Sequence, residues 1–419
     1  MSDLVMVTQT TQSSVPVSVP TIIVPRPALT VRTMTPRPLR VTNLSDYLTD
    51  IQPDQLPTRR ILDCRPQADF VACHLHPSVN FPEPRFDDRR YYQLPAKHIP
   101  LDILVPHEPS GEPYLTDAHM LWEKGWTVEH VVPVQGSYLA PPASPAPLPD
   151  AGWGLADRLG VTVRKGLYGG SGHPAPTHHV LFDPCPPLTT HITTIEQALP
   201  APPNGFRTVL DLGCGSGRDL AWLCSRHQRE APLHGAGTTP LPWYGMGIDS
   251  VRGALRRARV LIQQQNVSSQ VGLCHGKFHY DGQFYLKSPQ DDPLFENPDL
   301  PLTQVRATDP LLPSGEAPVS ITAQFNLVVG IRFLNRALFN SGQMDRWIAP
   351  GGFLLYSTFV QGEAYPNEHP QDPKHRLLPG ELARLFGPDQ GYEILHDAEE
   401  CIEDGRHVNS FLARKLPQP

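Results

Sequence analysis

The stretch that decides the fold of this chain reads Val209-Leu-Asp-Leu-Gly-Cys-Gly-Ser-Gly217. Its first half is apolar and has the length of a buried strand, whereas its second half has glycine at every other position. The residues that follow, as far as Cys224, carry apolar side chains at helical spacing. Glycines let a backbone pass close to a ligand, and the first turn of a helix offers unpaired N–H groups. We therefore predict a strand, a ligand-binding turn and a helix.

Two acidic residues narrow the kind of ligand, because a lone Gly-x-Gly-x-Gly turn also fits a dinucleotide site. Asp211 precedes the first glycine by two positions. Asp249 ends a second apolar strand at 244–249. A carboxylate at the tip of this second strand is suited to accept hydrogen bonds from both hydroxyls of a ribose. We expect Asp211 and Asp249 to meet at one edge of a parallel sheet.

The rest of the C-terminal half adds further strands and helices. A fourth strand is predicted at 325–331, and 347–359 has the pattern of a helix end, a Pro-Gly-Gly turn and a fifth strand. A last helix at 377–382 and a closing hairpin at 392–395 and 407–414 follow. This order resembles the class I methyltransferases that use S-adenosylmethionine (SAM), whose seven-stranded sheet binds SAM over the carboxyl ends of its first strands. The resemblance covers about residues 164–415, and we predict a methyltransferase domain at 164–416.

The resemblance implies SAM as the cofactor and gives roles to individual residues. Asp211 would reach the cationic amino-acid end of SAM, and Asp249 would accept the ribose hydroxyls. Lys277 or Phe278 would lie beside the adenine. The predicted cofactor-binding residues are Asp211, Gly213, Cys214, Gly215, Gly217, Arg218, Asp249, Ser250, Lys277, Phe278 and Gly330. Candidates on the methyl-acceptor side follow strand ends, although each is as readily an ordinary rim residue: Arg332, Arg336, Tyr356 and Thr358.

Three short segments indicate a subgroup within this class. The segments 181–187, 217–219 and 356–359 together are similar to the tellurite-resistance-type and related small-molecule methyltransferases. We therefore expect transfer of a methyl group to a small-molecule or thiol-like acceptor. One alternative is a non-catalytic SAM-binding or scaffold protein, and another is a protein methyltransferase, although the segment after the fourth strand lacks an Asn-Pro-Pro-Tyr-like motif. An NAD-dependent dehydrogenase is a third, but no residues for hydride chemistry are recognisable.

The N-terminal half contains a second, smaller α/β pattern at 41–140. Strands are predicted at 60–64, 103–105 and 128–134, with a short helix at 116–124. Residues 43–48, 61–66 and 74–82 resemble a rhodanese-like domain. Rhodanese chemistry needs a thiolate after the central strand, but the loop that follows 103–105 has no cysteine and carries Glu108. We therefore expect no sulfurtransferase activity, and we interpret this unit as a docking module for a protein partner or a substrate-presenting module.

Proline marks the predicted boundaries between these units, since 49 prolines interrupt the chain. Residues 1–40 are rich in Ser, Thr, Val and Pro and are expected to form a disordered tail. A proline-rich linker is predicted at 141–163. Inside the methyltransferase domain, a Pro- and Asp-rich insertion at about 288–320 is too long for an ordinary loop, so it is predicted to be a lid or a disordered excursion.

Composition excludes several other classes of function. The formal net charge is −7 and no basic run is present, so nucleic acid is not an expected partner. No apolar stretch approaches the roughly 20 residues that a membrane span needs. The cysteines and histidines show no disulfide or metal-ligand spacing, and no metal is predicted. We expect a cytoplasmic protein; the acid-poor, arginine-containing tail leaves mitochondrial import as an alternative, which its prolines disfavour.

Overall fold

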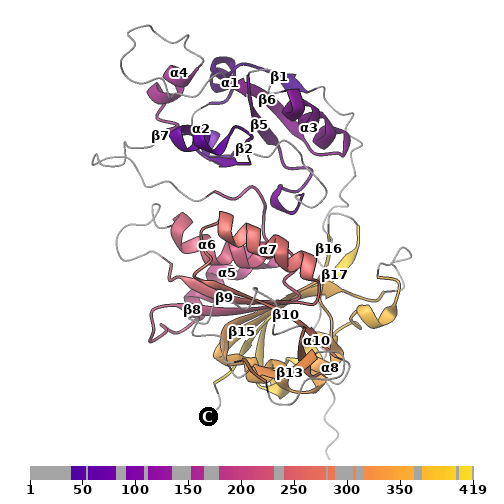
Figure 1. Cartoon of the computed structure of the whole chain (residues 1–419). Coiled ribbons are helices and arrows are strands. Elements are labelled where there is room, and N and C mark those ends of the chain that lie inside the picture. The colour runs from indigo at the N-terminus through magenta and orange to yellow at the C-terminus, as the bar shows by residue number, and fades with distance from the viewer. Residues whose placement is uncertain are drawn as a thin grey trace, which may run out of the picture. The chain divides into compact units, whose positions relative to one another are not determined.

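A computed structural model shows the arrangement of most of the chain (Figure 1). It describes residues 39–52, 55–81, 91–107, 112–134, 152–164, 179–230, 240–279, 282–287, 305–307, 316–321, 323–362, 370–402 and 405–417. Residues 1–38 of the tail predicted at 1–40 therefore lie outside the described residues. No helix in the described part of the chain is long and apolar enough to cross a membrane.

The N-terminal unit is built on a five-stranded parallel sheet in the order β1-β6-β5-β2-β4. Its strands are β1 (Arg40–Val41), β2 (Arg60–Asp63), β4 (Ser78–Asn80), β5 (Leu101–Pro106) and β6 (Val128–Val134). Helix α3 (Glu112–Glu123) packs on one face, while α1 (Leu44–Asp50) and α4 (Trp153–Arg158) pack on the other. A short helix α2 (Gln67–Ala72) and the turns η1 (Leu56–Thr58) and η2 (Tyr91–Gln93) complete the unit. The strands predicted at 60–64, 103–105 and 128–134 are thus confirmed.

The C-terminal unit is built on a mixed sheet in the order β12-β13-β11-β10-β9-β8-β14-β15-β17-β16. Its parallel centre consists of β8 (Arg207–Leu212), β9 (Trp243–Asp249), β10 (Val271–Phe278), β14 (Phe325–Ile331) and β15 (Ile348–Phe359). At one edge an antiparallel hairpin pairs with β15 and is formed by β16 (Tyr392–Cys401) and β17 (His407–Lys415). The predicted mixed α/β fold with a parallel sheet is confirmed.

The sheet has ten described strands where seven were expected. The additional strands extend the other edge and are β11 (Phe284–Lys287), β12 (Val305–Ala307) and β13 (Glu316–Ile321). Strand β10 allows this because its last residues, Gly276–Phe278, continue past β9 and pair with β11. Parts of the insertion predicted at 288–320 therefore belong to the sheet, whereas 288–304 and 308–315 lie outside the described residues.

Helices cover both faces of this second sheet (Figure 1). One face is packed by α5 (Pro186–Ala198), α6 (Arg218–Glu230) and α7 (Arg252–Gln264), and the other by α8 (Arg336–Asn340), α9 (Gln343–Trp347) and α10 (Glu381–Leu385). Short turns η6 (Pro373–His375) and η7 (Pro388–Gln390) flank α10. All six residues of β8 are buried, because this strand is central and covered on both sides. The apolar residues Val209, Leu210 and Leu212 are typical of a parallel strand that is covered on both faces, and they made the strand recognisable in the sequence.

The segment predicted as a linker at 141–163 is only partly described. Residues 141–151 lie outside the described residues. The remainder contains α4, whose Trp153 is buried, and β7 (Thr162–Arg164), which pairs antiparallel with β3 (Cys73–Leu75). The domain limits at 41–140 and 164–416 stay predictions.

Candidate functional site

The glycine turn joins the carboxyl end of β8 to the first residue of α6. Gly213, Gly215 and Gly217 all have positive φ angles, of 71°, 55° and 72°. A Cβ atom at Gly217 would lie 2.9 Å from Cβ of Ala258, so this glycine lets α7 pack closely. A Cβ atom at Gly213 would lie 2.9 Å from the ring of Phe333. At Gly215 the nearest atom would be 4.0 Å away, so this glycine is the one that borders open space.

Asp249 fastens this turn to the second strand. Its carboxylate accepts hydrogen bonds from the N–H groups of Gly215, at 2.8 Å, and Val251, at 2.7 Å. The carbonyl of Ile248 accepts two more, from Gly213 and Cys214. An ionised carboxylate has about four acceptor positions, so the bonds from Gly215 and Val251 leave Asp249 able to accept others. The glycine turn therefore lies against the end of β9, as the sequence predicted.

Asp211 is the most unusual side chain of the site. It lies in β8, it is 3% exposed, and its carboxylate accepts no hydrogen bond from any described residue. Burial, together with the negative charges of Asp219 and Asp249, raises the pKa of Asp211 well above its usual range. An ionised carboxylate in this position lacks the partner that a buried charge requires. The site therefore fits a ligand that carries a positive charge.

The segment at 181–185 is held against the first turn of α6. The guanidinium of Arg218 donates to the carbonyl of Asp183 at 2.9 Å and lies 5.3 Å from the ring centre of Phe182. Asp219 accepts a hydrogen bond from the N–H of Cys185 at 2.7 Å. Burial raises the pKa of Asp219, although the Cys185 bond and the charge of Arg218 oppose that rise. Arg218 and Asp219 thus position the wall of the site, and no direct ligand contact is needed to explain their side chains.

On the side predicted to hold the adenine, the register of the strands brings a further residue, His275, beside Asp249. Asp249 of β9 pairs with His275 of β10, and Nε2 of His275 is 3.3 Å from the carbonyl oxygen of Ser250. Lys277 is exposed and pairs with Tyr285 of β11. Phe278 is buried and packs against other aromatic rings, those of Phe284, Phe333 and Trp347. His275 was missed, and the expectation that neighbouring parallel strands end at one level would have found it.

Two further predicted cofactor residues have packing roles. Cys214 is buried, and a Cβ atom at Gly247 would lie 2.9 Å from its sulfur, so its side chain packs between the turn and β9. Gly330 stands near the end of β14, where a Cβ atom would lie 2.2 Å from the ring of Tyr356. The Tyr356 ring therefore fills the space beside Gly330.

A cavity of about 500 Å³ lies on the side predicted for the methyl acceptor. It is lined by Arg332, Leu334, Thr358, Phe359, Pro370, His375 and Arg406. Of the predicted acceptor-side residues, Arg332 and Thr358 thus line the cavity, whereas Arg336 and Tyr356 do not. Sequence reasoning missed Arg406, which precedes β17 and is brought beside Phe359 by the antiparallel pairing of β17 with β15.

The other two acceptor-side candidates, Arg336 and Tyr356, are held by contacts within the fold. Arg336 donates to both carboxylate oxygens of Glu381, at 2.6 and 2.8 Å, and to the carbonyls of Lys374 and Arg376, so it ties α8 to α10. Tyr356 is fully buried, which raises the pKa of its phenol well above the usual range. No described residue forms a hydrogen bond with the Tyr356 hydroxyl.

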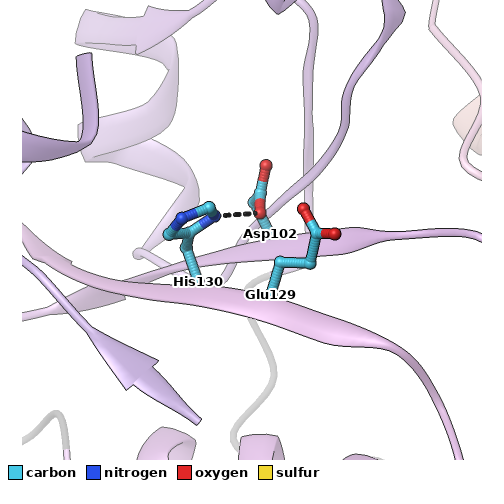
Figure 2. Close-up of side chains that lie close together, drawn as sticks. All are labelled: Asp102, Glu129 and His130. Carbon is cyan, nitrogen blue, oxygen red and sulfur yellow. Dashed lines mark hydrogen bonds and ion pairs between the residues drawn. The ribbon is translucent and has the colours of Figure 1, made fainter. Parts of the chain in front are cut away.

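A second cluster of ionisable groups lies in the N-terminal unit (Figure 2). One potential ligand atom from each of Asp102, Glu129 and His130 lies within 4.8 Å of the others, a spacing that a metal ion could bridge. However, Asp102 already accepts two hydrogen bonds from Arg59, both at 2.7 Å, and Arg59 also donates to Glu129 at 2.6 Å. The guanidinium supplies the positive charge that the carboxylates need. We interpret this cluster as a structural ion-pair network.

No protein-family model matches the chain. It is similar to a protein of Schizosaccharomyces pombe that is described as uncharacterized, with 29% identity over 366 residues, which cover 85% of this chain and 94% of that protein.

Several solved structures are similar to the chain at low identity. TehB from Haemophilus influenzae is 16% identical with a TM-score of 0.33, and the match covers 54% of this chain and 62% of TehB, less than two thirds of its length. A SAM-dependent methyltransferase from Aquifex aeolicus is 12% identical with a TM-score of 0.29, covering 50% and 82%. An O-methyltransferase family protein from Burkholderia thailandensis is 14% identical with a TM-score of 0.31, covering 55% and 57%.

Proposed function

We propose that the C-terminal unit is a SAM-dependent methyltransferase that acts on a small molecule. One observation carries the proposal: Asp211 is buried without a hydrogen-bond donor, and it is close enough to Asp249, which accepts the N–H of Gly215, for the charge of Asp249 to raise its pKa. SAM combines a positively charged amino-acid and sulfonium end with a ribose that has two hydroxyls. The residues fit these groups, because Asp211 needs a cation and Asp249 retains acceptor positions.

The negative charge of the carboxylates distinguishes a SAM site from a dinucleotide site. A dinucleotide places its pyrophosphate at the glycine turn, where the helix N-terminus attracts negative charge. Here the charges of Asp219 and Asp249 lie close enough to Asp211 to raise the pKa of its carboxyl. Three carboxylates would repel a pyrophosphate and attract a cation. The order of strands and helices, which resembles that of class I methyltransferases, supports the same proposal.

The residues of the chain would mainly align the reactants and exclude water. When bound, SAM supplies a methyl group that is activated by its sulfonium. Asp211 would neutralise the cationic end, Asp249 would hold the ribose, and the wall formed by 181–185 would shield this edge from solvent. The cavity that Arg332 and Thr358 line would hold the acceptor. A general base is needed only for a protonated acceptor, and we assign none.

The N-terminal unit is proposed to be a non-catalytic rhodanese-like module that docks a protein partner or presents substrate. The parallel sheet with helices on both faces supports this fold, together with the resemblance of residues 43–82. The loop in which a catalytic cysteine would be required is 106–111, of which 108–111 lie outside the described residues. Its sequence contains no cysteine, so we expect no sulfurtransferase activity.

The proposal is tested by calorimetry with SAM and with its demethylated product, S-adenosylhomocysteine, followed by a metabolite screen for SAM-dependent turnover. Wild-type protein should bind both nucleosides. Asp249→Ala should weaken binding by about 1–3 kcal/mol, the cost of losing a charged hydrogen-bond partner. Asp389→Ala, which removes an exposed carboxylate from η7, should leave the affinity unchanged. Failure of the wild-type protein to bind either nucleoside would remove the proposal.

A further inference from the structure

We propose that the cavity beside Arg332 and Arg406 binds a small organic anion, and that this anion is the methyl acceptor. The anion-binding part of this inference stands on the cavity alone. Its identification as the acceptor rests on the proposed methyltransferase function.

The described lining of the cavity has positive and apolar groups but no acid. Arg332 and Arg406 contribute guanidinium groups and His375 an imidazole, while Leu334 and Phe359 contribute apolar surface. Guanidinium groups recognise carboxylates and phosphates with paired N–H donors. A volume of about 500 Å³ is in the range of pockets that enclose small molecules. The lining therefore fits a molecule that has an anionic end and an apolar body.

Arg332 is held in a backbone conformation that few residues other than glycine adopt. Its φ angle is 54°, and its N–H donates to the carbonyl of Ser357 at 2.7 Å, which pins it to β15. Such conformations cost on the order of 1–3 kcal/mol and cluster at functional sites. No described carboxylate forms a close ion pair with Arg332. Arg336, four residues later, is by contrast fully engaged with Glu381.

The cavity also neighbours the glycine turn. Burial raises the pKa of Asp219, and the positive charge of Arg332 is one of the influences that oppose this rise. Arg332 therefore lies within electrostatic range of the first turn of α6, where the proposed SAM site begins. An anion bound at Arg332 would consequently be placed next to the cofactor rather than on a remote surface.

Arg406 also lines the cavity and makes an aromatic contact with another lining residue, Phe359. Its guanidinium carbon lies 4.5 Å from the ring centre of Phe359, a distance typical of a cation–π contact. This contact favours a guanidinium position beside the ring. Loss of side-chain entropy on ligand binding is then smaller than for a mobile arginine. Two arginines from separate loops are thus positioned on one cavity before any ligand arrives.

The inference is tested by ligand-observed NMR titrations of the full chain with three probes of similar shape: benzoate, phenyl phosphate and neutral benzamide. Each titration is run with and without S-adenosylhomocysteine. At least one anion should bind, and benzamide should bind at least about tenfold more weakly, because charged hydrogen bonds are lost. Preference for benzoate over phenyl phosphate, or the reverse, identifies the anionic group.

Variants then locate the binding. The double variant Arg332→Gln/Arg406→Gln should lower anion affinity at least about tenfold, while the affinity for S-adenosylhomocysteine is retained. Arg406→Gln alone leaves the strained backbone at Arg332 unchanged and should also lower the anion affinity. Arg332→Lys/Arg406→Lys should recover part of the affinity. Arg346→Gln removes an exposed arginine from α9, at the opposite end of β15, and should have no effect.

The results separate the two proposals. Equal binding of benzamide, undiminished anion binding in the double variant, or no anion binding by the wild-type protein would each overturn the anion site. Absence of S-adenosylhomocysteine binding would instead remove the methyltransferase proposal, while the titrations without nucleoside would still decide whether the cavity takes an anion.

Discussion

Two buried aspartates, one in each sheet, show how the surroundings of a charge distinguish structure from function. Asp102 of β5 and Asp211 of β8 are 0% and 3% exposed. Burial alone would raise the pKa of Asp102, but hydrogen bonds from His130 (Figure 2) and from Arg59 lower it, and Tyr47 donates a further bond. Asp211 has no such donor, and its pKa is raised. A buried carboxylate whose hydrogen-bond positions are filled stabilises the fold, whereas a buried carboxylate without donors indicates a ligand site.

The positions of the two aspartates in their sheets agree with this distinction. Asp102 is the second residue of β5 and so lies at the amino end of a parallel strand. Asp211 is the last but one residue of β8, at the carboxyl end. In open α/β sheets, ligands bind outside the carboxyl ends of the strands. The ion-pair network of the first sheet is therefore at the end where structural contacts are expected.

The largest effect is expected on stability, from removing the hydrogen-bonded carboxylate of Asp102. Asp102→Ala would leave Arg59 and His130 without their common partner in a largely buried site. We expect the free energy of unfolding to fall by about 3–5 kcal/mol, measured by urea denaturation followed by circular dichroism. Glu129→Ala is the matched control, because its side chain is 36% exposed and should cost less than about 1 kcal/mol. Equal losses for the two variants would contradict a structural role for Asp102.

A smaller effect is expected from closing the open backbone of the second site. Gly215→Ala introduces a side chain at a positive φ angle, which costs about 1–2 kcal/mol, and occupies the space above the turn. SAM affinity should fall at least about tenfold, because the ligand and the methyl group would compete for that space. Gly391→Ala is the matched control. Gly391 also has a positive φ angle and borders open space, so an alanine there introduces similar backbone strain away from the site. If both variants bind SAM like the wild-type protein, Gly215 does not border the ligand.

The smallest effect is expected from neutralising the carboxylate of Asp211 in the protein without cofactor. A carboxyl with a raised folded pKa binds its proton more tightly when folded, so its contribution to stability is complete below about pH 4 and is lost as pH rises through the raised pKa. Asp211→Asn cannot ionise. It should be more stable than the wild-type protein at neutral pH, by on the order of 1 kcal/mol, with the difference shrinking toward acidic pH. A difference that is constant in thermal unfolding scans across pH would show that Asp211 does not carry this linkage.

The sequence predicted the features that depend on local pattern. Strand β8 and its glycine turn were recognisable because the strand is apolar at Val209, Leu210 and Leu212 and because glycine permits positive φ angles. The predicted boundaries of β14 and β6 also matched, because both strands are rich in apolar and β-branched residues. The pairing of Asp249 with the turn followed from the rule that parallel strands end at one edge.

Features that depend on long-range register were not predictable. The extra strands β11, β12 and β13 need partners that lie far apart in the sequence, and short strands of mixed composition carry little signal. Arg406 lies at the cavity only because β17 pairs with β15 in one particular register. The packing of Phe278 against three aromatic rings from other parts of the chain likewise depends on long-range pairing. Arg336 had an acid partner, Glu381, that the sequence did not place nearby.

The charge of Asp211 as the partner of a cationic ligand is tested most directly by calorimetry with SAM at several pH values, in buffers of different ionisation enthalpy. Because the free carboxyl has a raised pKa, SAM binding to the wild-type protein should release protons and become tighter as pH rises. Asp211→Asn should bind at least about tenfold more weakly and release fewer protons. Unchanged affinity and proton release in this variant, or no binding of SAM by the wild-type protein, would contradict the account.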